Sequence, residues 1–454
     1  MLFTTKWLTT FLTDYQGAAQ DAIAVDAVTT DSRQEVKKAL FIPLEGEKFD
    51  GHDYVKQAFD NGAVAVIWNK QRPLPRFLPT DFPVFFVEDT LTALQTLAEN
   101  YRDKIDPTVI AITGSNGKTT TKDIVAAVMK SSYRTHYTNG NFNNHIGVPL
   151  TILSMPIETE VLVLEMGMNH FGEIEQLSIL SKPDFAIITN IGESHIEYLG
   201  SREGIAKAKL EITQGLKQNG LLLIDGDEPL IESMHKRDNV ITCGFENSND
   251  VIIESVRTNH NETVFNLSDG HVYHIPLLGK HHAKNAAYAV ALGSRLGIDK
   301  DVIKQALQTL TLTSMRFEIM TGTNDVSVIN DAYNASPTSM KAAIEVVKQM
   351  TGFTDKVLVL GDMFELGDYA NELHRSVAAV IDDSITVLFT LGEHAEEITK
   401  AVEQHHPNIT CNHFTSQEAL TDALGPYLKK DALLLFKASR GMQFESFVNA
   451  IIHP

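Results

Sequence analysis

A glycine-bearing stretch at residues 113–122 has the residue types of a phosphate-binding loop. It reads Thr-Gly-Ser-Asn-Gly-Lys-Thr-Thr-Thr-Lys, with two residues between Gly114 and Gly117. Glycines allow backbone N–H groups to crowd an anion at the N-terminus of a helix. Lys118 would reach the β- and γ-phosphates of a nucleotide, and the Thr119 hydroxyl would bind Mg²⁺. The stretch predicts a nucleoside triphosphate site; the alternative is a glycine turn before a helix, without a ligand.

The segments on either side of this loop must position it. Val109–Ile112 is an apolar run of the length of a buried parallel strand, and Lys122–Met129 has the spacing of a helix. Strand, glycine turn and helix together form the context that a phosphate loop needs. The usual spacing, G-x-x-x-x-G-K-[ST], would place a glycine at position 112, where this chain has isoleucine. We therefore expect a tighter loop.

Two further strand patterns in the central segment end at side chains that can bind metal. Val161–Leu164 is followed by Glu165, and Phe185–Ile191 is followed shortly by His195. Ligand groups in open α/β sheets gather at the carboxyl ends of the strands, and a carboxylate near a phosphate loop suits Mg²⁺. For His195, metal ligation competes with an ordinary surface or core histidine.

Two other central stretches are polar without having a single interpretation. The loop at 139–149 carries Asn141, Asn143 and Asn144, which could bind a polar substrate or serve turn chemistry alone. The helical stretch 205–211 carries two lysines, which could form a solvated helix face.

The whole chain has the composition of a globular protein. It has 454 residues, enough for roughly three domains. Its formal net charge of −20 argues against a nucleic-acid or anionic-membrane surface. Cys243 and Cys411 are far apart, which fits a reducing compartment. Residues 1–15 lack a signal-peptide pattern, and no run approaches eighteen apolar residues. We expect a cytoplasmic protein without stable membrane insertion.

Alternating strand and helix patterns indicate an α/β fold throughout. The N-terminal part shows strands at 40–44, 63–68 and 84–87, with helices at 54–61 and 91–102 and a polar linker at 103–107. The C-terminal part shows strands at 326–330, 357–360, 387–390 and 432–437, which predict a doubly wound parallel sheet. Ser336–Pro337 has the residues of a helix start. The expected domains are 1–106, 107–313 and 314–454.

Several motifs in this order resemble the Mur ligase family, which also includes folylpolyglutamate synthetases. They are the tight loop, Thr-Asp-Ser-Arg at 30–33, the run Glu-Met-Gly-Met-Asn at 165–169, the turn at 279–287, and Asp-Ala-Tyr-Asn-Ala-Ser-Pro at 331–337. The resemblance covers essentially the whole chain. It implies an N-terminal UDP-binding α/β domain, a central P-loop ATPase-like parallel sheet and a C-terminal doubly wound Rossmann-like domain. The C-terminal domain would contact D-alanyl-D-alanine and the nucleotide.

The resemblance also implies roles for individual residues. Catalytic roles fall to Lys118, Glu165, His195, Lys209 and Arg316. Nucleotide contacts fall to Gly114, Ser115, Asn116, Gly117, Lys118, Thr119, Thr120, His281, Asn285, Arg316, Asp331, Tyr333 and Asn334. Contacts to the other substrates fall to Ser32, Arg33, Asp50, His52, Asn141, Asn143, Asn144, Lys437, Ser439 and Arg440. Two Mg²⁺ ions would be bound by Thr119, Glu165, His195 and Lys209.

The 165–169 and 331–337 motifs point to one branch of the family. That branch uses ATP to join D-alanyl-D-alanine to UDP-N-acetylmuramoyl-tripeptide through an acyl phosphate, in peptidoglycan precursor synthesis. A sister ligase that adds one amino acid, a folylpolyglutamate synthetase and a P-loop switch that hydrolyses ATP are the alternatives. We expect a monomer whose matched residues meet only when the domains close. Whether the tripeptide ends in L-lysine or meso-diaminopimelate is not set by the sequence.

Four residues at three places depart from the family pattern, and one lysine has two interpretations. Lys37-Lys38 stand where a Pro-Gly turn is expected, His282 replaces an asparagine, and Ala438 replaces a glycine, which would strain it if that position needs a positive φ. In the family, the lysine that matches Lys209 can be carbamoylated by CO₂. The alternative is a plain lysine that pairs with Glu211 or a phosphate.

Overall fold

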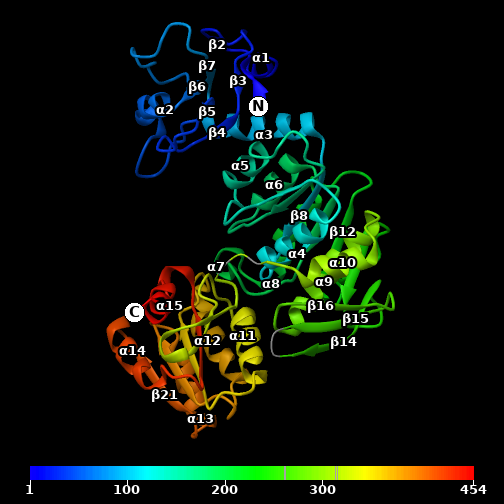
Figure 1. Cartoon of the computed structure of the whole chain (residues 1–454), viewed down its shortest axis with the longest axis vertical. Coiled ribbons are helices and arrows are strands. Elements are labelled where there is room, and N and C mark those ends of the chain that lie inside the picture. Colours follow the sequence, from blue (N-terminus) through cyan, green and yellow to red (C-terminus); the bar gives the residue numbers. More distant parts are fainter. Residues whose placement is uncertain (260–261, 312, 314, 454) are drawn as a thin grey trace.

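The chain folds into three α/β units, shown by the computed structural model in Figure 1. The structure describes residues 1–259, 262–311, 313 and 315–453. The central unit lies between the N-terminal unit and the C-terminal unit. Within the described residues, no helix is both long and apolar enough to cross a membrane. The predicted α/β fold with three units is confirmed.

The N-terminal unit contains a small, mainly parallel sheet in the order β2-β7-β6-β5-β4. Its strands are β2 (Tyr15–Gln16), β4 (Ala27–Thr29), β5 (Ala39–Phe41), β6 (Ala63–Asn69) and β7 (Val84–Val87), and its helices include α1 (Thr5–Leu8) and α2 (Val55–Asp60). A short antiparallel pair, β1 (Phe3–Thr4) and β3 (Ala24–Val25), lies beside it. Lys38 has φ 55°, so the chain does make a left-handed turn before β5 despite lacking a glycine there.

Helix α3 (Thr90–Ile105) connects the N-terminal unit to the central one. Asp89 caps it by accepting a hydrogen bond from the Thr92 N–H at 2.7 Å. The helix packs against α5 and α6 of the central unit, and the Tyr101 hydroxyl donates to the Met155 carbonyl at 2.8 Å. The predicted linker over 103–107 is therefore wrong for its first three residues, because α3 continues through Ile105 and the apolar face of the helix keeps it packed.

The central unit is built on a nine-stranded sheet among the described residues, in the order β16-β15-β14-β13-β12-β11-β8-β10-β9. The strands are β8 (Thr108–Thr113), β9 (Thr135–Tyr137), β10 (Val161–Glu165), β11 (Phe185–Ile188), β12 (Leu221–Asp225), β13 (Val240–Gly244), β14 (Val251–Thr258), β15 (Thr263–Leu267) and β16 (Val272–Ile275). The strands from β9 to β14 run parallel, and β14, β15 and β16 form an antiparallel extension.

Strand β8 lies between β10 and β11, which places three predicted site segments at one edge of the sheet. Ile112 pairs with Glu165 on β10 and with Ile187 on β11. Because parallel strands end at the same edge, the loops after β8, β10 and β11 emerge together. The helices of this unit are α4 (Lys118–Lys130), α5 (Gly147–Leu153), α6 (Glu173–Ser181), α7 (Ile196–Leu199), α8 (Arg202–Leu210), α9 (Lys280–Arg295) and α10 (Lys300–Gln308).

The C-terminal unit is a doubly wound sheet in the order β17-β18-β22-β19-β20-β21, parallel except at β17. Its strands are β17 (Glu318–Thr321), β18 (Ser327–Asn330), β19 (Asp355–Gly361), β20 (Val387–Leu391), β21 (Thr410–Phe414) and β22 (Ala432–Lys437), and its helices are α11 (Pro337–Gln349), α12 (Ala370–Arg375), α13 (Glu396–His405), α14 (Gln417–Leu424) and α15 (Glu445–Ile452). Ser336 caps α11 in a reciprocal arrangement with Ser339, which confirms the predicted helix start.

Candidate active site

The phosphate-loop residues connect β8 to α4, and the loop is held by the segment after β11. Gly117 has φ 76° and is the N-cap of α4. A Cβ on Gly114 would lie 1.8 Å from the Thr189 hydroxyl oxygen, so only glycine fits there. The Thr189 hydroxyl donates to the Asn116 carbonyl at 2.6 Å, and the Asn116 N–H donates to the Asn190 side-chain oxygen at 2.9 Å. The loop therefore keeps its shape through contacts with a neighbouring strand end.

Thr189 and Asn190 are supporting residues that sequence reasoning placed inside a strand. Strand β11 ends at Ile188, three residues earlier than predicted. The chain leaves the sheet there because the Thr189 hydroxyl and the Asn190 amide bond to the phosphate loop. Polar residues at the carboxyl end of a predicted strand were the available signal.

Lys118 and Glu165 lie within electrostatic range of each other at this edge. The Lys118 ammonium donates to the Gly114 carbonyl at 2.8 Å and to the Ser115 carbonyl at 3.4 Å. Burial lowers the pKa of Lys118, the Glu165 carboxylate opposes that shift, and Arg316 adds to it. The site therefore holds cations close together, as a polyphosphate ligand would require.

Glu165 offers a carboxylate oxygen without a protein partner. Its side chain is 2% exposed, and its Oε1 accepts a hydrogen bond from Asn143 Nδ2 at 2.8 Å. Its Oε2 is buried and has no hydrogen-bond partner among the residues that the structure describes. A buried carboxylate oxygen of this kind is costly unless a cation satisfies it. The residue therefore fits a Mg²⁺ ligand.

A cavity of about 480 Å³ lies between the central and C-terminal units. The predicted residues that line it are Ser115, Asn116, Gly117, Lys118, Thr119, Thr120, Asn143, Asn144, Glu165, His195, His281, Asn285, Arg316, Asp331, Tyr333, Asn334 and Lys437. Residues from both units line this cavity together. That the matched residues meet only when the domains close stays a prediction.

Side chains of the C-terminal unit reach directly to the phosphate loop and its helix. Arg316 Nη2 donates to the Thr119 hydroxyl oxygen at 3.2 Å, and its guanidinium stacks 3.9 Å from the centre of the Tyr333 ring. The Ser336 hydroxyl donates to Asn116 Oδ1 at 2.8 Å. These contacts place a fixed positive charge beside the helix N-terminus, where phosphates bind.

Lys437 is held by a buried ion pair. Its ammonium lies 2.6 Å from Asp331 Oδ2 and donates to the Asn334 carbonyl at 3.1 Å. The backbone of the adjacent Ala438 does not have a positive φ. The strain that would follow from alanine in place of glycine therefore does not occur. His282 was given no role because it departs from the family pattern, yet it is buried and lines the same cavity as Asn285.

Lys209 lies on α8 and does not line the cavity. It is 1% exposed, and its Nζ has no hydrogen-bond partner within the described part of the chain. Burial, together with the nearby Lys118 charge, holds the pKa of Lys209 well below its usual range, while Glu211 opposes the shift. Burial therefore favours the neutral form of this amine.

A second cavity of about 310 Å³ adjoins the first and shares His195, Tyr333 and Asn334 with it. It contains two of the predicted substrate residues, Ser439 and Arg440. His195 has φ 65°, and its Nδ1 lies 2.5 Å from Glu365 Oε2, across the boundary between the two units. Glu365 belongs to the stretch Glu365-Leu366-Gly367, which matches the family pattern, but the match gave it no role of its own.

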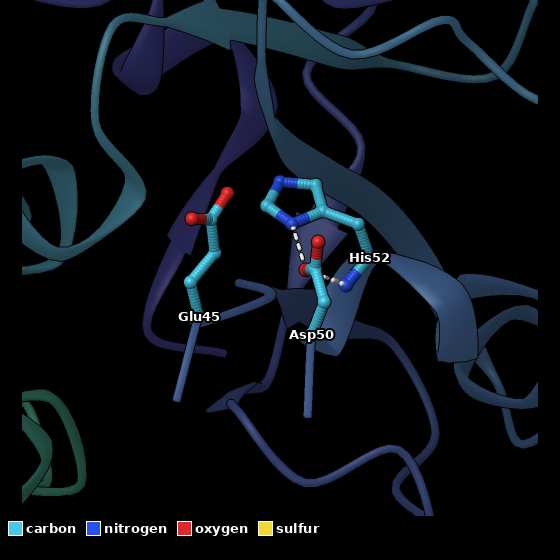
Figure 2. A group of neighbouring side chains, drawn as sticks. All are labelled: Glu45, Asp50 and His52. Atoms are coloured by element: carbon cyan, nitrogen blue, oxygen red, sulfur yellow. Dashed lines mark hydrogen bonds and ion pairs between the residues drawn. The ribbon is translucent and has the colours of Figure 1, made fainter. Parts of the chain in front are cut away.

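The predicted uridine-side residues lie apart, in the N-terminal unit. Figure 2 shows Asp50 and His52 pointing toward each other beside Glu45. His52 Nδ1 bonds Asp50 Oδ1 at 2.7 Å, and its Nε2 accepts from the Asn69 N–H at 3.4 Å. Arg72 pairs with Asp50 and, at 3.1 Å, with Glu45. The group of Glu45, Asp50 and His52 therefore already holds a cation, which argues against a metal there.

Ser32, Arg33 and Asn141 complete the account of the predicted residues. Ser32 is buried and its hydroxyl donates to Gln57 Oε1 at 2.9 Å, whereas Arg33 is exposed and paired with Asp31 at 2.8 Å. Asn141 is exposed, Gly114 is buried within the phosphate loop, and neither residue lines either cavity. The N-terminal set therefore stands outside both cavities.

Family comparisons agree with this geometry. Three family descriptions match the chain: "Mur ligase family, catalytic domain" over residues 24–102, "Mur ligase middle domain" over 112–293, and "Mur ligase, glutamate ligase domain" over 315–440. These ranges cover most of the chain and all three units. The chain belongs to the Mur ligase family.

Individual relatives carry a more particular name. The UDP-N-acetylmuramoyl-tripeptide–D-alanyl-D-alanine ligase of Bacillus subtilis is 47% identical over 430 residues, covering 94% of this chain and 93% of the relative. The enzyme of the same name from Escherichia coli is 35% identical over 456 residues, covering 97% of each chain.

Solved structures show the same relationship. A crystal structure of MurF from Acinetobacter baumannii superposes with a TM-score of 0.86 at 29% identity, covering 99% of this chain and 98% of that one. MurF ligase from Thermotoga maritima in complex with ADP gives a TM-score of 0.81 at 28% identity, covering 93% of this chain and 96% of that one. The three-unit arrangement is thus shared with solved proteins.

Proposed function

We propose that this chain is an ATP-dependent ligase that joins D-alanyl-D-alanine to UDP-N-acetylmuramoyl-tripeptide, giving the UDP-N-acetylmuramoyl-pentapeptide of peptidoglycan synthesis. The observation that most directly supports this proposal is the cavity that the phosphate loop, Glu165 and Arg316 line together. Relatives with this name align along nearly the whole chain. Because the reaction consumes ATP and a nucleotide-linked precursor, we place it in the cytoplasm.

A carboxylate does not condense with an amine in water, so it must first be activated. In the proposed reaction, an oxygen of the tripeptide carboxylate attacks the γ-phosphorus of ATP, the bond to the β-phosphate oxygen breaks, and ADP leaves. Two anions must approach each other in this step. Lys118 and Arg316 supply the positive charge that offsets their repulsion.

The dipeptide then completes the amide bond. Its amino nitrogen attacks the carbonyl carbon of the acyl phosphate, the C–N bond forms, the amine loses a proton to solvent, and phosphate leaves as the C–O bond breaks. Water would destroy the acyl phosphate. The position of the cavity between two units, lined by buried Thr119 and Glu165, supports a site that limits access of water.

The residues around Glu165 fit bound Mg²⁺. Glu165 would hold it through its unpartnered Oε2, with Thr119 and His195 as the other candidate ligands. When bound, Mg²⁺ would neutralise phosphate charge during the displacement. Thr119 and Glu165 are buried and held in place by contacts to Arg316 and Asn143.

The surroundings of Lys209 support a carbamate. A neutral lysine nitrogen can attack the carbon of CO₂, so that an N–C bond forms while the electron pair of one C=O π bond moves to oxygen and the nitrogen releases a proton to solvent. The product is a carbamate, whose anionic oxygen can serve as a ligand. Burial of Lys209 supports this modification over pairing with Glu211, because its Nζ has no hydrogen-bond partner within the described part of the chain.

The decisive experiment measures products and ADP release together. Purified protein is incubated with ATP, Mg²⁺, D-alanyl-D-alanine and a panel of UDP-N-acetylmuramoyl peptides ending in L-lysine, meso-diaminopimelate or D-glutamate. We expect ADP release and a product of pentapeptide mass only when a tripeptide and the dipeptide are both present. ATP hydrolysis that is independent of both substrates would instead support a P-loop switch, and addition of a single amino acid would support a sister ligase.

A further inference from the structure

The second cavity has its own pattern of charges. Its ionisable lining residues are His195, Tyr333, Glu365 and Arg440, so its lining contains one carboxylate and one guanidinium, and that guanidinium is exposed and also lies 3.2 Å from Glu445 Oε1. At about 310 Å³ it lies near the lower end of small-ligand pockets, which run from roughly 300 to 1,000 Å³. A small zwitterion, with an ammonium at one end and a carboxylate at the other, matches both the volume and the charges.

The backbone holds Glu365 firmly in this cavity. The Met363 N–H donates to His374 Nε2 at 2.9 Å, and the Phe364 N–H donates to the Ser439 hydroxyl oxygen at 2.8 Å. Glu365 itself has φ 62°, a conformation that costs a non-glycine residue free energy. A strained residue held by two neighbouring hydrogen bonds is characteristic of a preorganised functional site.

Glu365 also links the second cavity to the nucleotide cavity. Its Oε2 lies 2.5 Å from His195 Nδ1, and its carbonyl accepts from the Glu197 N–H at 3.2 Å. Its side chain is 35% exposed, and its Oε1 accepts no hydrogen bond from the residues that the structure describes. One carboxylate oxygen is thus engaged beside the first cavity while the other remains able to bind a ligand.

We propose that Glu365 binds the amino group of the incoming D-alanyl-D-alanine, while Arg440 provides the positive charge for its carboxylate. This inference rests on the proposed function. The acceptor arrives as an ammonium at neutral pH, and a carboxylate beside the shared wall of the two cavities would hold its nitrogen next to the acyl phosphate. Glu365 would therefore select amine acceptors and position them, and the ammonium would lose a proton to solvent before its nitrogen attacks.

The competing role for Glu365 is to orient His195 alone. The two roles can be separated by combining one substitution in the protein with one substitution in the ligand. The variant is Glu365→Gln, and the ligands are D-alanyl-D-alanine and its analogue D-lactoyl-D-alanine, in which a hydroxyl replaces the amino group. Affinities are measured calorimetrically with a non-hydrolysable ATP analogue, Mg²⁺ and UDP-N-acetylmuramoyl-tripeptide present, so that no turnover occurs. Glu372→Gln, an exposed residue outside both cavities, is the matched control for loss of charge.

We expect Glu365→Gln to weaken dipeptide binding by about tenfold or more, as for loss of a charged hydrogen bond. Affinity for the hydroxyl analogue should change little, and Glu372→Gln should match the wild type for both ligands. Equal losses for both ligands, or no loss for either, would overturn the ammonium-binding role while leaving the proposed ligase function intact. Failure of the wild-type protein to bind or use the dipeptide would overturn both proposals.

Discussion

The Ser336 hydroxyl donates a 2.8 Å hydrogen bond to Asn116 Oδ1, so the N-cap of a C-terminal helix touches the phosphate loop of the central unit. The same hydroxyl oxygen accepts from the Ser339 N–H. One side chain thus stabilises a helix start and joins two units at the nucleotide cavity.

Replacing Ser336 should separate these two contributions. Ser336→Ala should destabilise the fold by about 1 kcal/mol through the lost cap and should also raise the KM for ATP. Ser416→Ala is the control, because Ser416 caps α14 through the Ala419 N–H but has no place in either cavity. The readouts are chemical denaturation and ATP-dependent kinetics. An equal KM for ATP in both variants would show that the Ser336–Asn116 contact does not contribute to nucleotide binding.

Lys118→Ala should lower the rate on the order of a hundredfold or more, because it removes a positive charge at the γ-phosphate. The fold should survive, since the loop is held by Thr189 and Asn190. Steady-state kinetics and the thermal midpoint check the two expectations. Near-wild-type turnover would contradict the assignment of the phosphate loop.

Lys209→Ala should lose activity, and a small carboxylate such as formate should restore part of it by supplying the missing oxygen ligand. Lys207→Ala, an exposed position on the same helix, should remain active. Activity is measured over a formate titration. Complete loss without rescue, together with an active Lys209→Arg variant, would show that the site uses the lysine cation.

Lys209 should also make stability depend on pH. Its folded-state pKa is lowered by burial, so between that pKa and the unfolded value of about 10.4 the unfolded chain holds the extra proton. Stability therefore rises with pH through this window. Lys209→Met should raise the thermal midpoint at neutral pH and flatten the slope, measured in metal-free buffer depleted of CO₂. An unchanged pH profile would indicate that the amine is not held neutral.

Domain closure should involve the N-terminal unit. The central and C-terminal residues already share a cavity, so an ATP analogue alone should change the radius of gyration little in small-angle scattering. Adding UDP-N-acetylmuramoyl-tripeptide should reduce it, because the predicted uridine-side residues lie outside both cavities. An unchanged radius with both ligands would favour a preformed site.

Local sequence patterns were sufficient to predict what depends on short-range physics. The strand before Gly114, the glycines of the tight loop and the Ser336 cap all follow from residue types and spacing. The start of α4 was predicted four residues late, because its first turn, Lys118–Thr121, is polar and is fixed by the loop. The antiparallel extension of β14 to β16 was not anticipated, because its pairing depends on distant segments.

The contacts between units were the part of the site that could not be predicted from the sequence. Glu365 and His195 are far apart in the chain, and each has a left-handed backbone that no residue type announces. Lys209 had two interpretations, and its burial without a partner favours one of them only once α8 is packed. Such features arise from tertiary packing, which overrides local pattern.

Helix α3 connects the predicted uridine-side residues of the N-terminal unit to the nucleotide cavity. Its apolar face belongs to a core that includes residues of both the N-terminal and the central unit, and Gln95 Nε2 on the helix donates to the His145 carbonyl at 3.1 Å, in the asparagine-rich loop that lines the nucleotide cavity. A rotation of the N-terminal unit about this helix would therefore move the asparagine-rich loop. If a bound uridine ligand changes the affinity of the protein for ATP by some factor, then bound ATP changes its affinity for the uridine ligand by the same factor.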